Sequence, residues 1–135
     1  MSADTDVVRK LSSAECWDLL RANNFGRLAY HLRARTRVTP INYAVDGERL
    51  IFRTAEGTKF YALKVEDQVA LQIDFVGEDS AFSVVANGGV HEITEDADVE
   101  EATINLRPLI RTEKKHVFAI EVTKVRGRSF VLGRT

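Results

Sequence analysis

The sequence is poor in cysteine and proline and has no long apolar run. Its one cysteine, Cys16, excludes an internal disulfide bond and a cysteine-rich metal site. No apolar stretch approaches the roughly 20 residues that a membrane-spanning helix needs. The start of the chain is polar and lacks the apolar region of a signal peptide. Together these absences predict a cytoplasmic protein without a membrane partner.

The chain also lacks an excess of charge of either sign. Its formal net charge is −1, so no overall field attracts nucleic acid or an anionic membrane. Arg33, Arg35 and Arg37 form a local basic run, which we expect to be a loop. No aromatic residues interleave with these arginines, so a solvated loop explains them better than a nucleic-acid contact does. The sequence therefore predicts no nucleic-acid partner.

The common patterns of catalytic and metal-binding residues are missing too. His31, His91 and His116 lack the spacing of metal ligands. The sequence has no Gly-x-Ser-x-Gly elbow for a nucleophile and no glycine-rich turn of a dinucleotide-binding sheet. We therefore predict no metal site, and the residues identify no catalytic acid, base or nucleophile.

What is present fits one domain. The 135 residues are 44% hydrophobic and 29% charged, which is ordinary for a globular protein of this length. Residues 1–10 are expected to be a flexible N-terminal lead-in, and residues 11–135 a single domain. We find no internal repeat, low-complexity tract or linker that would divide this range.

A helix is predicted to begin at Ser12. Ser12 is a good N-cap, and Glu15 stands at the capping-box position three residues later. Leu11 and Cys16 have the spacing of a hydrophobic staple across this helix start. We expect Cys16 to be a packing residue, since no group near it in sequence would lower its pKa. Asn23, Asn24 and Gly26 would end the helix.

Most of the remaining chain alternates apolar and polar residues, which is typical of strands. Pro40 cannot donate to a ladder, so its strand should lie at a sheet edge or at a break in pairing. Asp46-Gly47 suits a type I′ hairpin turn, and Gly88-Gly89 a bulge. A helix is expected from Glu95 to about Ile110. The predicted strands are 28–32, 38–45, 49–54, 69–75, 81–93, 116–125 and 128–132, with a turn at Arg126-Gly127 between the last two.

This order of elements predicts the fold class. About seven strands follow each other at hairpin-like spacing, and about three helices interrupt them. The pattern favours an α+β protein that is mainly β, an antiparallel barrel with a few appended helices.

One stretch, Arg53–Lys59, has the features of an anion site. It follows a predicted strand and precedes a short apolar segment that can start a helix near Thr58. Gly57 permits a sharp turn, and the N–H groups of a helix start point toward such a turn. Arg53 and Lys59 add full charges. The stretch suits a phosphate group, although a solvated strand-to-helix turn would have the same residues.

At this point several motifs together resemble a known family. The chain resembles the FMN-binding split-barrel proteins related to pyridoxamine 5′-phosphate oxidase, especially the branch of nitroimidazole-resistance-type proteins. The resemblance extends from about Leu11 to Phe130. The matching motifs, in order, are residues 15–20, 26–30, 40–47, 53–59 and 82–85.

The resemblance implies an antiparallel split β-barrel and a homodimer with FMN between the two chains. It places Arg53, Thr54, Thr58 and Lys59 on the phosphate, with Gly57 shaping the turn. It places the backbone of Pro40, Ile41 and Asn42 along the isoalloxazine ring. Ser83 and Val84 would approach the ring or the ribityl chain. Arg128, and with it Arg126, would approach a flavin held mainly by the other chain.

The chain departs from the branch pattern at a few positions. Phe82 stands where Trp is usual, and Asn87-Gly88-Gly89 replaces a more usual Arg-Gly pair. The resemblance implies an FMN-dependent oxidoreductase but names neither its substrate nor its electron donor. Two alternatives stay open, because the family also contains haem binders and deazaflavin users: a non-catalytic flavin or haem binding protein, and a deazaflavin-dependent reductase.

Overall fold

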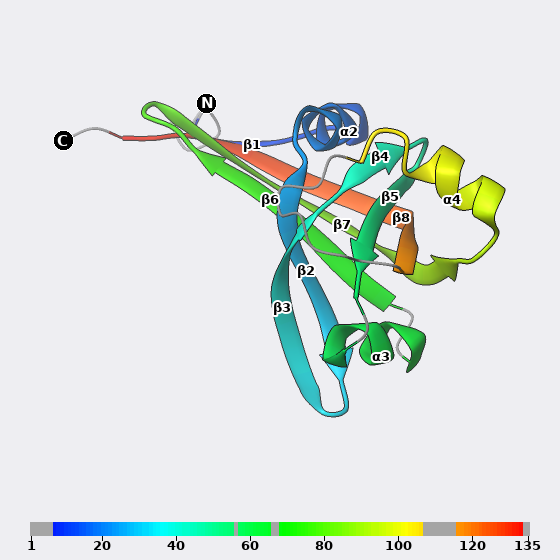
Figure 1. The fold of residues 1–135 in the computed structure, drawn as a ribbon. Helices are drawn as coiled ribbons and strands as arrows, with labels where there is room; N and C mark the ends of the chain where they lie inside the picture. Colours follow the sequence, from blue (N-terminus) through cyan, green and yellow to red (C-terminus); the bar gives the residue numbers. More distant parts are fainter. Residues whose placement is uncertain (1–6, 56, 66–67, 107–115, 134–135) are drawn as a thin grey trace.

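An antiparallel sheet of eight strands dominates the structure and curls around a single main core (Figure 1). The computed structural model describes residues 7–55, 57–65, 68–106 and 116–133. In chain order the elements in these ranges are β1 (Val8–Lys10), α2 (Ser13–Ala22), β2 (Phe25–Leu32), β3 (Arg35–Asn42), β4 (Ala44–Asp46), β5 (Arg49–Thr54), α3 (Thr58–Val65), β6 (Gln68–Val76), β7 (Ser80–Ile93), α4 (Asp96–Ala102) and β8 (His116–Val131).

The sheet becomes a split barrel because its two end strands are neighbours in the chain. The strands pair in the order β3-β2-β6-β7-β8-β5-β4. Strands β3 and β4 are separated only by Tyr43, so the sheet must curl to bring its ends together. Tyr43 is buried, its N–H donates to the carbonyl of Asn24 at 2.9 Å, and its hydroxyl donates to the carbonyl of Leu20 at 2.8 Å. Burial raises the pKa of this hydroxyl. The predicted fold class is confirmed.

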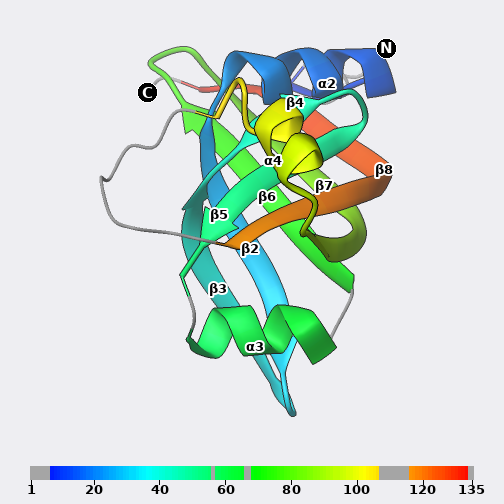
Figure 2. The same cartoon turned by 45° about the vertical axis from the view of Figure 1, so that its right-hand side comes forward.

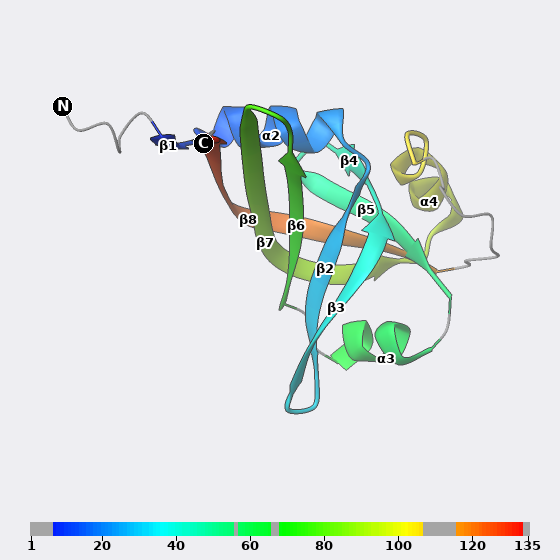
Figure 3. The same cartoon turned by 90° about the vertical axis from the view of Figure 1, so that its left-hand side faces the viewer.

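Helices α2 and α3 lie at opposite ends of the barrel (Figures 1 and 3). Both contribute to the main core, α2 through Cys16 and Leu20 and α3 through Phe60 and Leu63. The third helix, α4, lies outside the barrel against β5 and β8 (Figure 2), where it closes a smaller core with Ile51, Ile93, Ala102, Val117 and Ala119. Strand β5 is therefore covered on both faces.

The predicted start of α2 is confirmed in detail. The Glu15 N–H donates to Ser12 Oγ at 3.1 Å, and the Ser12 N–H donates to Glu15 Oε1 at 2.9 Å, which is a complete capping box. Arg9 adds two bonds to the Glu15 carboxylate. These bonds lower the pKa of Glu15 to about 2. Cys16 is fully buried, as a packing residue should be, and burial raises the pKa of its thiol.

The two hairpins in the first half of the chain differ from the prediction in detail. The basic run 33–37 is not a loop, because β3 already begins at Arg35 and only Arg33 and Ala34 form the turn. Arg33 adopts a positive φ of 58° in this turn. In the second hairpin Asp46 pairs with Arg49, so Gly47 and Glu48 are the central residues. A positive φ is present at Gly47 (62°) but not at Glu48, which excludes the predicted type I′ turn.

The C-terminal strand is longer than the sequence predicts. Arg126-Gly127 is no turn, because both residues pair with β7 inside the continuous strand β8. Gly127 is required by packing, since a Cβ there would lie 2.9 Å from both Cys16 Sγ and Leu11 Cδ1. The expected helix of residues 95–110 ends at Ala102, and Pro108 lies outside the described residues.

The lead-in predicted for residues 1–10 also ends earlier than expected. Val8–Lys10 pair with β8, with Lys10 opposite Arg128. Residues 1–6 lie outside the described part of the chain. None of the helices that the structure describes has the length and apolar character of a membrane span.

The predicted bulge is confirmed, and it generates a test of the fold. The register of β7 and β8 shifts between Asn87 and Gly88, so that Thr123 is the extra residue of β8. A Cβ on Gly88 would collide with the backbone carbonyl of Glu121. We expect Gly88→Ala to lower the free energy of unfolding by about 1–3 kcal/mol in urea titrations. Gly133→Ala is the control, because nothing lies within 4 Å of a Cβ there. Equal stability of both variants would contradict this assignment.

Candidate functional site

Strand β5 ends and α3 begins where the sequence predicts. Strand β5 ends at Thr54 and α3 begins at Thr58, where the sequence places a helix start. The Tyr61 N–H donates to the carbonyl of Gly57 at 3.1 Å and closes the first helical turn. Gly57 has a φ of 156°, which other residues rarely adopt. The positive end of the α3 dipole therefore faces the chain that arrives from β5.

The side chains of this turn are not equally suited to a ligand. Arg53 is half-buried, and its guanidinium has no hydrogen bond or ion pair with other described residues. Thr54 is buried, and its hydroxyl donates to the carbonyl of Ala55 at 3.1 Å. Lys59 is half-buried at the start of α3. Arg53 can thus turn to an anion without breaking a hydrogen bond or ion pair to a described residue, whereas the Thr54 hydroxyl already donates its proton to Ala55.

A polar cluster that the sequence did not reveal supports α3. Glu92 accepts a hydrogen bond from Lys64 Nζ at 2.6 Å, and its other oxygen lies 2.7 Å from His116 Nδ1. The His116 ring lies 4.2 Å from the Phe60 ring, measured between centroids. Burial raises the pKa of Glu92, but the bonds from Lys64 and His116 outweigh it, so the pKa is lowered overall. No local spacing could predict this cluster, because its members come from three separate elements.

The predicted ring-binding segment lies on an edge strand. Pro40 is exposed on β3, the first strand of the sheet, as its missing N–H requires. Ile41 is buried in the core, so its side chain is not available to a ligand. The Asn42 amide donates to the carbonyl of Asn24 at 2.9 Å.

Ser83, Val84 and Arg128 divide between the two faces of the sheet. Val84 is fully buried in the core, so its side chain does not share the face of Ser83. Ser83 pairs with Arg128 across β7 and β8, and paired residues share a face. Ser83 and Arg128, together with their neighbours, line a groove of about 470 Å³ on the outside of the barrel. We call it the outer groove and define it by Lys10, Ser83, Val85, Arg126, Arg128 and Phe130.

The predicted residues therefore form two groups rather than one. Arg53 pairs with Val117 near the start of β8, whereas Arg128 lies eleven residues further along the same strand. An extended strand of that length spans about 36 Å. The α3 end and the β1 end of the barrel also lie at opposite ends in Figures 1 and 3. Pro40 lies nearer the second group, in the row of paired residues Pro40, Arg27, Gln72, Val85 and Arg126.

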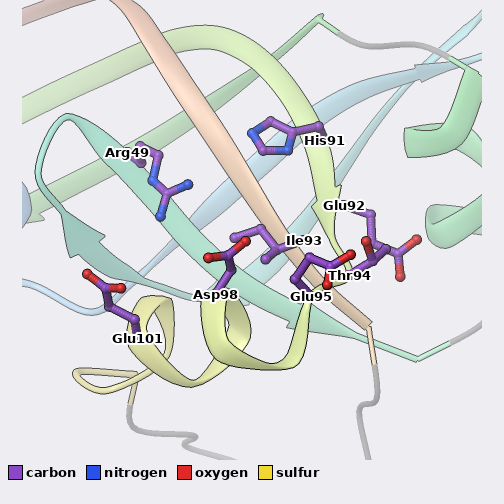
Figure 4. Close-up of a pocket in the computed structure, with 8 residues that line it drawn as sticks. All are labelled: Arg49, His91, Glu92, Ile93, Thr94, Glu95, Asp98 and Glu101. Atoms are coloured by element: carbon purple, nitrogen blue, oxygen red, sulfur yellow. The ribbon is translucent and has the colours of Figure 1, made fainter.

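A second pocket, beside α4, contains none of the predicted site residues. Its volume is about 400 Å³, and acidic side chains dominate it (Figure 4). Arg49 at its rim bonds to Asp46 at 2.6 Å. Among the described residues, no group of three or more metal-ligating side chains occurs. This acidic pocket has no feature that points to a ligand.

Comparison with known proteins identifies the class of protein. A family model described as pyridoxamine 5′-phosphate oxidase matches residues 12–129. The chain therefore belongs to the pyridoxamine 5′-phosphate oxidase family. An uncharacterised protein of Mycobacterium tuberculosis is 32% identical over 90 residues, which cover 66% of this chain and 82% of that protein.

Two solved structures are similar along nearly the whole chain. One is a candidate pyridoxamine 5′-phosphate oxidase from Corynebacterium glutamicum, with a TM-score of 0.85, 28% identity and coverage of 96% of this chain and 97% of that one. The other is an FAD binding protein from Mycobacterium smegmatis, with a TM-score of 0.78, 31% identity and coverage of 91% and 98%. The family and the split-barrel fold predicted from the sequence are confirmed.

Two more distant structures share the fold alone. A candidate 5-nitroimidazole antibiotic resistance protein from Bacteroides thetaiotaomicron is 13% identical, with a TM-score of 0.77 and coverage of 91% of this chain and 89% of that one. A heme binding protein from Mycobacterium smegmatis is 18% identical, with a TM-score of 0.70 and coverage of 87% and 54%. Proteins with this fold thus bind flavin in some cases and haem in others.

The cluster under α3 generates a prediction on pH. Because the pKa of Glu92 is lowered on folding, its contribution to stability is present above the ordinary Glu pKa of about 4.3 and is lost as the pH falls through the folded value. Glu92→Gln should cost about 1–2 kcal/mol of unfolding free energy at neutral pH. The cost should shrink when urea titrations are repeated at progressively lower pH.

Glu95→Gln is the matched control, because it removes one carboxylate that has no partner among the described residues. Parallel stability curves for wild type and Glu92→Gln across the acid range would contradict the assigned role of Glu92.

Proposed function

We propose that this protein is an FMN-binding oxidoreductase whose cofactor phosphate binds at the β5–α3 turn. The observation that carries the proposal is that Arg53, five residues before the start of α3, has a guanidinium with no hydrogen bond or ion pair to other described residues. A planar guanidinium binds phosphate oxygens in pairs, and the helix start adds N–H donors. Membership of the pyridoxamine 5′-phosphate oxidase family supports flavin as the ligand class.

The residues of the turn have different tasks in this proposal. Arg53 and Lys59 neutralise the phosphate, Thr58 offers the backbone at the helix start, and Gly57 shapes the turn. Thr54 supports the turn through its bond to Ala55 rather than through the phosphate. The bound flavin would supply the electron transfer, while the chain binds and orients it. We assign no catalytic acid or base.

We further propose that the functional unit is a homodimer. The two groups of site residues lie too far apart in one chain for a single FMN, but two chains can bring unlike ends together. The outer face of the sheet exposes apolar side chains suited to an interface: Phe25 is 49% exposed and Val38 is 64% exposed. In such a dimer Ser83 and Arg128 of one chain meet a flavin anchored by Arg53 and Lys59 of the other.

Three alternatives differ from this proposal in their cofactor or in their activity. The similar FAD binding protein of Mycobacterium smegmatis favours FAD as a second flavin candidate. A haem binding protein and a deazaflavin-dependent reductase remain alternatives from the family resemblance. The absorbance spectrum of the purified protein separates flavin, deazaflavin and haem. Reduction of the bound flavin by NAD(P)H, followed by reoxidation, separates an enzyme from a carrier. A cytoplasmic location stays a prediction from the sequence.

The phosphate anchor gives the first test. Arg53→Ala and Lys59→Ala should each raise the dissociation constant of FMN by about tenfold or more, because a hydrogen bond to a charged group contributes about 1.5–3 kcal/mol. Fluorescence titration with FMN measures the change. Arg35→Ala removes an exposed arginine outside the turn and is the matched control. Unchanged FMN binding in both anchor variants would rule out the phosphate assignment.

The dimer gives the second test. Sedimentation should show a stable dimer at micromolar concentration, which Val38→Glu dissociates and Ile104→Glu, at a 75% exposed position outside the sheet face, does not. In a mixed dimer, one chain carries Lys59→Ala and the other carries Arg128→Ala. If Arg128 acts across the interface, both substitutions affect the same flavin site and the other site stays intact. Two impaired sites would show that Arg128 acts within its own chain.

A further inference from the structure

The outer groove has an unusual arrangement of charge. Lys10 pairs directly with Arg128 across β1 and β8. Arg126 is two residues before Arg128 on the same strand, so the two side chains leave the same face about 7 Å apart. Like charges placed directly opposite each other in a sheet are destabilising. The groove therefore holds three adjacent cations at a cost that a bound anion would offset.

None of these cations is neutralised by another residue of the described part of the chain. Lys10, Arg126 and Arg128 make no hydrogen bond or ion pair with the side chains that the structure describes. Four other arginines each face a carboxylate, namely Arg9, Arg21, Arg27 and Arg49. Successive side chains of β1 point to opposite faces of the strand. Arg9 therefore binds Glu15 on α2, whereas Lys10 lines the groove.

One carboxylate of the sheet, that of Asp74, lies in the same row of paired residues as Ser83 and Arg128, but it does not neutralise them. Asp74 pairs with Ser83 across β6 and β7. Its oxygens accept hydrogen bonds from Gln72 at 2.9 Å and from Arg27 at 3.4 Å, and these bonds lower the pKa of Asp74. The Asp74 carboxylate thus bonds to Gln72 and Arg27 rather than to the cations of the groove, and the groove remains basic.

The groove also has an apolar part. Val85 and Phe130 line it beside the cations, and Ser83 adds a hydroxyl. Its volume of about 470 Å³ is within the range of small-molecule sites. A ligand that carries both a ring and phosphate groups would use the apolar and the basic part together.

We propose that the outer groove is a second ligand site, which binds the diphosphate of a nucleotide through Lys10, Arg126 and Arg128 and its ring against Val85 and Phe130. Lys10 makes the N-terminal strand part of this site. The diphosphate belongs to a nicotinamide dinucleotide that donates electrons, since the proposed function places the phosphate of the flavin itself at the β5–α3 turn. The link to electron transfer rests on the proposed function, whereas nucleotide binding itself does not.

Calorimetric titration with ADP, at low salt to limit screening, tests the site. Wild type should bind ADP, and Lys10→Met and Arg126→Gln should each raise its dissociation constant by about tenfold. Both substitutions keep a long side chain and so preserve packing on the strands. Lys10→Arg should restore most of the affinity. Lys124→Ala is the matched control, because Lys124 is an exposed cation of the same strand outside the groove.

Two outcomes would overturn the proposal. One is the absence of saturable ADP binding to the wild type at millimolar concentration. The other is an equal loss of affinity in Lys124→Ala and Lys10→Met, which would show attraction to positive charge in general. Circular dichroism of each variant confirms that it is folded before the titration is interpreted.

Parallel titrations separate this site from the flavin anchor and identify the nucleotide. Lys10→Met should leave FMN affinity unchanged, because FMN has no diphosphate. If FMN binds and ADP does not, the groove proposal fails while the flavin anchor stands, and the reverse result rejects the anchor alone. A raised KM for NADPH in Lys10→Met with unchanged FMN binding assigns the diphosphate to the electron donor.

Discussion

The break in the sheet at Tyr43 is the constraint on which the rest of the structure depends. The chain leaves β3 and enters β4 there, so one short stretch supplies both ends of the sheet. Leaving a buried polar group unpaired would cost about 1–3 kcal/mol. The Tyr43 N–H and hydroxyl avoid this cost by donating to Asn24 and Leu20. Because Leu20 belongs to α2, the same bonds fix the helix over one end of the barrel.

Closure of the barrel determines where the candidate site residues lie. It places β5 between β4 and β8, with the main core on one face and the core under α4 on the other. A strand buried on both faces has little freedom, so Arg53, near the end of β5, has a defined position before the turn to α3. The cluster of Lys64, Glu92 and His116 then ties α3 to β7 and β8.

The length of β8 gives the molecule two polar regions rather than one. The strand runs from the α3 end of the barrel to β1 without interruption. The bulge at Thr123 shifts its alternation by one residue, so that Val122 and Val125 both pack on the core. Arg126 and Arg128 consequently face outward into the groove with Lys10. The length of β8 explains why one chain alone does not bring the expected set of residues together.

The sequence by itself determined the elements whose signals are local. The capping box of Ser12 and Glu15, the helix start at Thr58, the edge position of Pro40 and the bulge at Gly88 depend on neighbouring residues, and all are present. The turn predicted at Arg126-Gly127 is wrong, because a glycine can be needed for close packing as well as for a turn. Only the tertiary structure brings Cys16 and Leu11 against Gly127. The partners of Glu92 and the meeting of Lys10 with Arg128 likewise join residues far apart in the chain. No periodicity or spacing carries that information, since strand register is decided by the packing of the whole sheet.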